Sequence, residues 1–350
     1  MKEEADQCLQ MRVTDMDKSL RVQGEILLDT NQASSQTLQN SSLALQMMRA
    51  MHQQLMVQQL AVQQLMSQGG MREESSTKPR QAIQDKCSSR KQVEDVLRAL
   101  RYDPGAVEKD VGMTLQLGAA LDDKAQAKAA SLINNADFKA YMTEHDFSAP
   151  LLVNGNDDMS SAEGLSPLSL VSAKLARMSQ ETESAIALSY FCSEHPVYGS
   201  RSSSVPVPVE MMSSLVGQLM SQISQNAGEI DLSFLDNIQW RKVEDLNPKI
   251  LFTIFVELMK QVPEGTLVFC IIDEPVLYET APCRQITMDI FRRLTRLVRK
   301  SKNMVFKLLV TCRGRSMAIH EHFFGHIVDL EEFVEDEDSS AWTIAHMGSG

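Results

Sequence analysis

The stretch Thr266 to Glu274, TLVFCIIDE, constrains the fold more than any other part of the sequence. Six consecutive apolar residues, Leu267 to Ile272, end at the acidic pair Asp273 and Glu274. A run rich in Val, Ile and Phe without alternation is typical of a strand that is covered on both faces. We therefore expect it to lie centrally in a parallel sheet. The acidic pair then projects from the carboxyl edge, where open α/β sheets bind ligands.

Four further apolar runs alternate with helical patterns along the chain. Ser166-Pro167 predicts a helix start, because a hydroxyl cap is followed by proline at the first helical position. Since strands that alternate with helices are joined by right-handed crossovers, we predict an α/β fold with a doubly wound, mainly parallel five-stranded sheet. The other strands are expected at 150–153, 185–191, 305–311 and 327–330, and the later helices at 209–225, 243–262, 284–300 and 316–323.

The first 70 residues favour a long helix. One heptad frame runs from Val13 to Leu65 without proline, and most of its seam positions are apolar. This pattern predicts a coiled-coil arm that joins chains into a homo-oligomer through residues 13–65, with a solvated arm as the alternative. We expect the chain to be organised as an arm at 1–70, a linker at 71–90, a helical lead-in at 91–145, an α/β domain at 146–330 and an acidic tail at 331–350.

Charge and cysteine usage narrow the classes of function. A net charge of −12 argues against a general binder of nucleic acid or anionic membranes, which needs surplus Lys and Arg. The 6 cysteines are scattered without a C-x-x-C pair, which is typical of reduced thiols in a cytoplasmic or nuclear protein. The sequence has no signal-peptide pattern at Met1 to Gln10 and no apolar stretch near the ~20 residues of a membrane span.

The turn after the first strand combines features for and against a phosphate loop. A phosphate loop needs a strand, a glycine-rich turn and a helix whose amino end faces the anion. Asn154-Gly155-Asn156 and the helix start at Ser166 satisfy parts of this requirement. The segment between them is longer than G-x-x-x-x-G-K-[ST] allows and carries Asp157, Asp158 and Glu163 in place of a lysine. Those carboxylates would repel a triphosphate.

The order of these segments resembles the NACHT/STAND class of P-loop NTPases. It is most similar to the nephrocystin-like N-terminal NTPase region of fungal proteins, including relatives whose Walker A motif is similarly degenerate. The resemblance covers Lys91 to Leu330, and Phe138 and Tyr141 match an F-x-x-[WY] pattern before the first strand. The segments that carry it are ASLINNADFKAYMTEHDFSAPLLVNGN, SPLSLVSAKLA, VFCIIDE and FKLLVTCRGRS.

The resemblance implies roles for single residues. Gly155 and Ser166, with Asn154 and Asn156 beside the glycine, would be Walker A remnants that bind ATP or GTP. Asp273 would be the Walker B acid, which binds magnesium with Ser166 and catalyses with Glu274. Thr311 and Arg313 would take the sensor position, and Arg315 would offer a second guanidinium to a phosphate. The missing lysine argues against hydrolysis, and the chain stops soon after the fifth strand, as expected of a shortened relative or an incomplete gene product.

Simpler roles compete with these. Asp273 can end a buried strand, Ser166 can cap a helix, and Arg313 and Arg315 can be solvated loop residues. Glu194 and His195, which follow the second predicted strand, are expected in a surface or capping role. The segment from His320 to His326 lacks the H-E-x-x-H order of a zinc site. The basic face of the helix at 284–300 is typical of a solvated side, or of a nucleic-acid binder. That face comprises Arg292, Arg293, Arg296, Arg299, Lys300 and Lys302.

These observations predict an interaction or regulatory scaffold on a degenerate NTPase fold, with protein partners and no membrane. A working ATPase or GTPase is the alternative. There Asn154 to Ser166 would wrap the nucleotide, Arg313 or Arg315 would replace the lysine, and Asp273 would hold magnesium. A nucleic-acid binder that uses the basic helix is the third class.

Overall fold

The computed structural model describes residues 91–118, 121–144, 147–157, 166–182, 185–197, 205–226, 230–237, 240–301 and 303–330. These residues belong to the part of the chain that runs from Gln59 to Gly350. The predicted arm at 13–65, the linker at 71–90 and the acidic tail at 331–350 lie outside the described residues and stay predictions.

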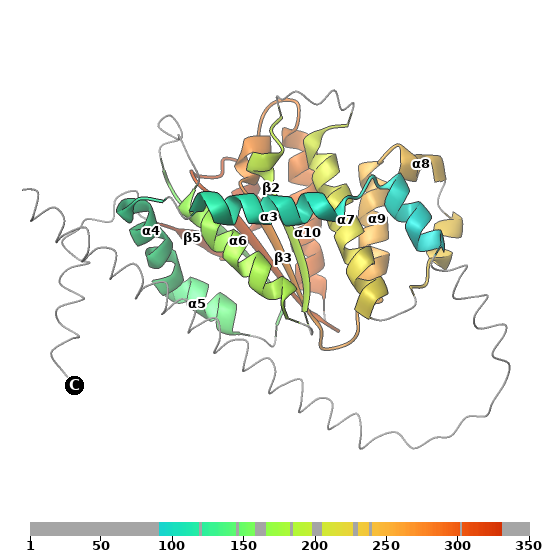
Figure 1. Cartoon of the computed structure of the whole chain (residues 1–350), viewed down its shortest axis with the longest axis horizontal. Helices are drawn as coiled ribbons and strands as arrows, with labels where there is room; N and C mark the ends of the chain where they lie inside the picture. Colours follow the sequence, from blue (N-terminus) through green and yellow to red (C-terminus); the bar gives the residue numbers. More distant parts are fainter. Residues whose placement is uncertain are drawn as a thin grey trace, which may run out of the picture. The chain divides into compact units, whose positions relative to one another are not determined.

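Five strands form one sheet in the order β2-β3-β4-β1-β5 (Figure 1). Every strand pair is parallel, which confirms the predicted five-stranded α/β sheet. The apolar run of TLVFCIIDE is the interior strand β3, and β4 rather than β3 is the middle strand. The strands are β1 (Ala149–Asn154), β2 (Ala185–Phe191), β3 (Leu267–Asp273), β4 (Val305–Cys312) and β5 (Ile327–Asp329).

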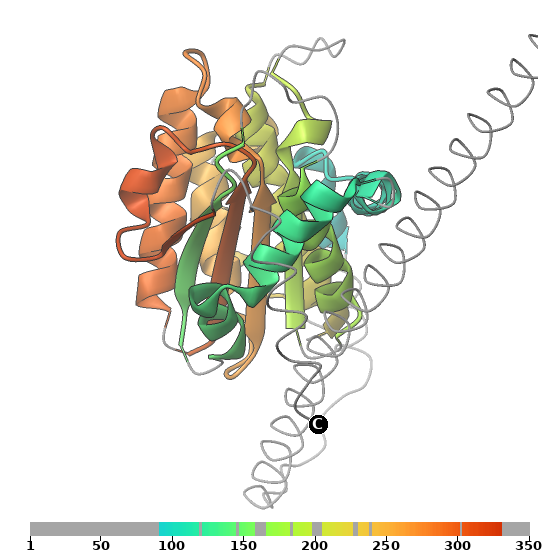
Figure 2. The ribbon, with the colours of Figure 1, turned by 90° about the vertical axis from the view of Figure 1, so that its left-hand side faces the viewer.

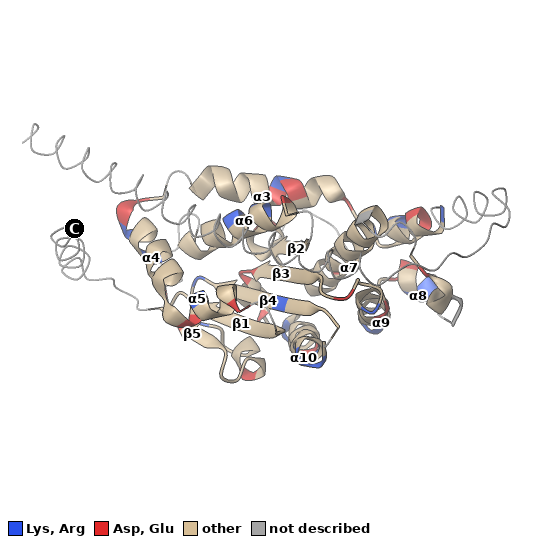
Figure 3. Ribbon diagram, turned by 90° about the horizontal axis from the view of Figure 1, so that it is seen from below, with Lys and Arg blue, Asp and Glu red and all other residues tan. Residues whose placement is uncertain are grey.

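Helices cover both faces of the sheet (Figures 2 and 3). One face carries α6 (Pro167–Gln180), against which α3 (Pro104–Gly118) and α4 (Asp123–Asn134) pack from outside. The opposite face carries α9 (Pro248–Met259) and α10 (Arg284–Lys300), and α7 (Val207–Asn226) runs along the free edge of β2. The remaining elements are a helix over 91–99, α5 (Ala136–Thr143), α8 (Trp240–Glu244), η2 (Cys192–Glu194), η3 (Ser233–Asn237), η4 (Pro275–Tyr278) and η5 (Ile319–His322).

Two helix predictions need correction. The segment 243–262 is not one helix, because Leu246 adopts a positive φ of 51° and Asn247 starts the new helix α9. The Asn247 side chain accepts a hydrogen bond from the Lys249 N–H, and Pro248 occupies the first helical position. The predicted helix at 316–323 is only the 3₁₀ turn η5.

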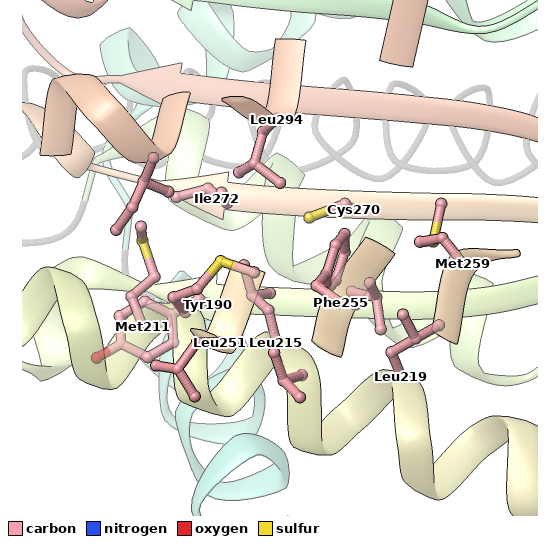
Figure 4. Packing of buried hydrophobic residues seen from close by; sticks show 14 of the residues in the cluster. Tyr190, Met211, Leu215, Leu219, Leu251, Phe255, Met259, Cys270, Ile272 and Leu294 are labelled. Atoms are coloured by element: carbon pink, nitrogen blue, oxygen red, sulfur yellow. The ribbon is translucent and has the colours of Figure 1, made fainter. Parts of the chain in front are cut away.

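A continuous apolar core lies between the sheet and the helices α7, α9 and α10 (Figure 4). Alternate residues of β2 and β3 point into it, and each helix contributes one apolar stripe. The labelled members are Tyr190, Met211, Leu215, Leu219, Leu251, Phe255, Met259, Cys270, Ile272 and Leu294. α10 lies against this core with its apolar side and keeps its arginines outside.

Two glutamines of α7 close the free edge of β2. Gln218 accepts a hydrogen bond from the Ser189 N–H and donates one to the Ser189 carbonyl. Gln222 does the same with Ala187, one turn further along the helix. The two side-chain amides take the place of a neighbouring strand, so this edge offers no unpaired peptides there to another chain.

We expect Gln218→Leu to destabilise the fold by about 1–3 kcal/mol, because it leaves the buried Ser189 peptide without partners while volume is conserved. Urea unfolding measures this loss. Gln225→Leu, on the same helix but bonded only to Ser221 in an exposed position, is the control and should stay within about 0.5 kcal/mol of the parent. Equal effects of the two substitutions would contradict the edge-closing role.

Candidate functional site

The topology brings the predicted site residues to one place on the sheet. After β1 the chain crosses through α6 to the β2 side, whereas after β4 it leads to β5 on the other side of β1. In open α/β sheets, the carboxyl ends of strands at such a switch point form the ligand crevice. The register aligns Asp273 with Thr311 and Thr311 with Val153, next to Asn154. The turn after β1 and the acid of β3 therefore emerge at the same edge.

Asp273 is fully buried at this edge. The Thr311 hydroxyl donates to its Oδ1 at 2.6 Å and lies 2.9 Å from the Ser172 hydroxyl of α6. Its Oδ2 atom has no hydrogen-bond partner among the described residues. Burial raises the pKa of the Asp273 carboxyl, while hydrogen bonding by the Ser169 and Thr311 hydroxyls acts in the opposite direction.

Glu274 connects the ends of β3 and β4. It has a positive φ of 57°, which is uncommon for a residue other than glycine. Its N–H donates to the Thr311 carbonyl at 2.8 Å, and its carboxylate accepts the Arg313 N–H at 2.7 Å. Burial and then the neighbouring Asp273 charge raise the pKa of Glu274, whereas Arg313 lowers it. This carboxylate is thus engaged with the protein backbone.

The turn after β1 lies directly against the loop after β4. The Gly155 N–H donates to the Cys312 carbonyl at 2.7 Å, and the Asp157 N–H donates to the Arg313 carbonyl at 3.0 Å. A Cβ atom at Gly155 would lie 2.4 Å from the Arg313 carbonyl oxygen, so only glycine permits this approach. The hydrogen bonding between β1 and β4 therefore continues past the strands as far as Asp157 and Arg313.

The two asparagines beside Gly155 serve the same loops. Asn154 donates to Asp329 at 2.8 Å and accepts the Ser316 N–H at 3.1 Å. Asn156 donates to the Leu330 carbonyl at 2.8 Å. Both predicted nucleotide contacts are hydrogen-bonded to the chain itself. These bonds fix the loops that follow β1, β4 and β5 relative to one another.

Ser166 and Arg315 have other roles in the structure than the predicted contacts. The Ser166 hydroxyl accepts the Leu168 N–H at 3.2 Å and caps α6, and Arg315 is exposed on the loop after β4. The α6 hydroxyls that lie near Asp273 and Thr311 are those of Ser169 and Ser172. Sequence reasoning missed them, although Ser166, Ser169 and Ser172 repeat every three residues along one side of the helix.

Sequence reasoning also missed Lys128. This α4 residue is only 5% exposed, and its Nζ donates to the Asp157 carboxylate in the turn after β1. A lysine from the helical lead-in thus binds the acid that stands where a phosphate loop carries its own lysine. The sequence feature that could have revealed it is its position on the buried side of α4, beside Ala129 and one turn before Leu132.

His195 has a structural partner. Its Nε2 lies 2.7 Å from Oδ2 of Asp110 on α3, and its ring stacks on Tyr190 with centroids 4.8 Å apart. The Tyr278 hydroxyl donates to the His195 carbonyl at 2.9 Å. The end of β2 is therefore tied to α3 and η4 rather than directed at Asp273.

The donor set does not fit a divalent cation as the residues stand. No group of three or more His, Cys, Asp or Glu side chains in the described ranges is arranged to hold a metal ion. Glu274 is committed to Arg313, and the Ser166 oxygen is committed to Leu168. Hard cations such as Mg²⁺ need several oxygen ligands at once.

No family model, curated protein or solved structure matches this chain. The resemblance to NACHT/STAND NTPases therefore stays an expectation from sequence. Within the part of the chain that the structure describes, none of the helices has the length and apolar character needed to span a membrane.

The raised pKa values of Asp273 and Glu274 predict a pH dependence of stability. Between the ordinary and the raised values, the folded chain holds more protons than the unfolded chain, so stability falls as the pH rises. Each carboxyl contributes at most about 1.4 kcal/mol per pH unit. We expect Asp273→Asn to flatten this decline in urea unfolding between about pH 4 and 7. A slope in Asp273→Asn as steep as that of the parent would contradict this prediction.

Lys128→Met should destabilise the fold by about 1–3 kcal/mol, because it leaves the partly buried Asp157 without its cation. Combining it with Asp157→Asn should restore most of the loss, since no uncompensated charge remains. Chemical unfolding of both variants checks this, with Lys242→Met at an exposed site as the control. A double variant no more stable than Lys128→Met would contradict the pairing.

Proposed function

We propose that this protein is an interaction or regulatory scaffold built on a degenerate NACHT/STAND-type NTPase fold. The observation that carries the proposal is the pairing of the Gly155 turn with the Arg313 loop at the switch point. A nucleotide phosphate needs the amides of this turn, and the Gly155 and Asp157 amides already donate to carbonyls. In this proposal the 13–65 arm joins chains and the α/β domain offers a surface to protein partners.

The acidic edge supports the same proposal. Asp157, Asp273 and Glu274 lie in the region where a triphosphate would sit, and Lys128 is already paired with Asp157. A bound triphosphate would lie against the Asp157 carboxylate or would have to displace it from Lys128. Like charges at short range in a low-dielectric site are strongly unfavourable.

A nucleotide-binding ATPase or GTPase is the second candidate. It is favoured by the buried Asp273 Oδ2 atom, which lacks a hydrogen-bond partner among the described residues. In that case Asp273 and Ser166 would hold the magnesium ion of ATP or GTP. Arg313 or Arg315 would replace the missing lysine.

Titration with fluorescent ATP and GTP analogues in the presence of Mg²⁺ separates the two candidates. For a scaffold we expect no saturable binding below about 1 mM, which corresponds to roughly −4 kcal/mol. Saturable micromolar binding that Asp273→Ala abolishes would contradict the scaffold proposal and support the second candidate. Asp245→Ala is the matched control, because this exposed acid follows α8 and pairs with Arg241.

A further inference from the structure

A groove separates the first half of α10 from η5. Its volume is about 510 Å³, and none of its lining residues belongs to the candidate site at the carboxyl edge. Met288, Ala281 and Ala318 supply apolar surface, and charged side chains surround them. The full lining is Ala281, Arg284, Gln285, Met288, Asp289, Arg292, Ala318, Glu321 and His322.

The charge around this groove is mainly positive. Arg284 and Arg292 line it, and α10 carries the further exposed cations Arg296, Arg299 and Lys300. The lining itself is balanced, because Asp289 pairs with Arg292 at 2.6 Å and Glu321 offsets Arg284. Burial and the nearby arginines lower the pKa of His322, so this ring is neutral near pH 7. An anionic ligand therefore meets a surplus of cations only where α10 continues beyond the groove, at Arg296, Arg299 and Lys300.

Apolar side chains stand at both ends of η5. Met317 precedes the turn and Phe324 follows it, and they are 73% and 74% exposed. They are the most exposed large apolar residues in the described ranges. A groove with three apolar lining residues beside the basic face of α10 fits a segment that combines carboxylates with one or two apolar residues.

The chain itself contains such a segment. Residues 331–338, EEFVEDED, place six acids around the apolar pair Phe333-Val334. The segment begins directly after Leu330, whose N–H donates to the Asn154 carbonyl at the carboxyl edge. α10 also begins at that edge, because it follows β3 and η4, and it packs against β1, the neighbour of β5.

The distance to be covered is short. One strand spacing of about 5 Å and one layer spacing of about 10 Å separate β5 from the helix layer that contains α10. Eight extended residues reach up to ~26 Å, so residues 331–338 can arrive at Arg284 and Arg292. A tethered segment of this length has an effective concentration in the millimolar range, which favours even a weak contact.

We propose that the acidic segment 331–338 docks in the groove between α10 and η5 and thereby covers the basic face of α10. The carboxylates at 335–338, five to eight residues after Leu330, pair with Arg284, Arg292 and Arg296. The segment competes with any acidic partner peptide for the groove, because such a peptide must displace it. This inference depends only on the groove and is independent of the nucleotide question.

The test uses the full chain in which the six acids of segment 331–338 are neutralised. The substitutions are E331Q, E332Q, E335Q, D336N, E337Q and D338N. Fluorescein-labelled peptide EEFVEDED is titrated by anisotropy at about 50 and 300 mM salt. We expect the neutralised chain to bind the peptide at least ten-fold more tightly than the parent chain, whose groove is filled. Binding should weaken at the higher salt concentration.

Two further variants of the neutralised chain locate the contact. The first carries Arg284→Gln, Arg292→Gln and Arg296→Gln together and should not bind the peptide. Because the three arginine side chains are exposed, we expect these substitutions to leave the fold intact. Arg98→Gln with Arg241→Gln removes two exposed arginines elsewhere and should change nothing. Equal peptide binding by the parent and neutralised chains would overturn the proposal, as would binding that survives the three α10 substitutions. Tighter binding of a short oligonucleotide than of the peptide would assign the face to nucleic acid instead.

Discussion

The burial of two adjacent carboxyl groups at the end of β3 is the constraint on which the rest of the carboxyl edge depends. Asp273 and Glu274 are both almost entirely removed from solvent. Such groups are tolerated only with hydrogen-bond partners or in the protonated form. Thr311 and the Arg313 amide provide partners, so β4 must run beside β3 in its observed register. The hydroxyls of α6 close the same site from above the sheet.

The loops around this pair follow from that requirement. Once Glu274 holds the Arg313 amide, the carbonyl of Arg313 is presented to the turn after β1, which accepts it only at a glycine. The hydrogen bond from the Asp157 amide then extends the ladder, and Lys128 neutralises the Asp157 side chain. Four segments far apart in sequence thus form one closed edge. This arrangement is the physical reason that the proposed function is a scaffold rather than a nucleotide hydrolase.

The edge at β2 and the exposed face of α10 are stabilised by other interactions than those of the carboxyl edge. At β2 the glutamines of α7 satisfy the edge peptides, so the sheet does not offer a site for an added strand there. On α10 the apolar residues Ile290, Phe291, Leu294 and Val298 face the core, and the arginines remain outside. A surface of this kind, next to the groove between α10 and η5, is where the proposed regulatory contact takes place.

The sequence by itself determined the strands, the parallel sheet and the edge at which the acids emerge. These depend on local signals, namely apolar runs of strand length, alternation with helices and an acid at a strand end. It also predicted that Ser166 starts α6, because a cap and a proline act within one turn. Only the tertiary structure decided that β4 is the middle strand, that Ser169 and Ser172 rather than Ser166 approach the buried edge, and that Lys128 reaches Asp157. These contacts join residues 29 to 139 positions apart, and their partners are chosen by chain crossing and burial, which no local pattern encodes.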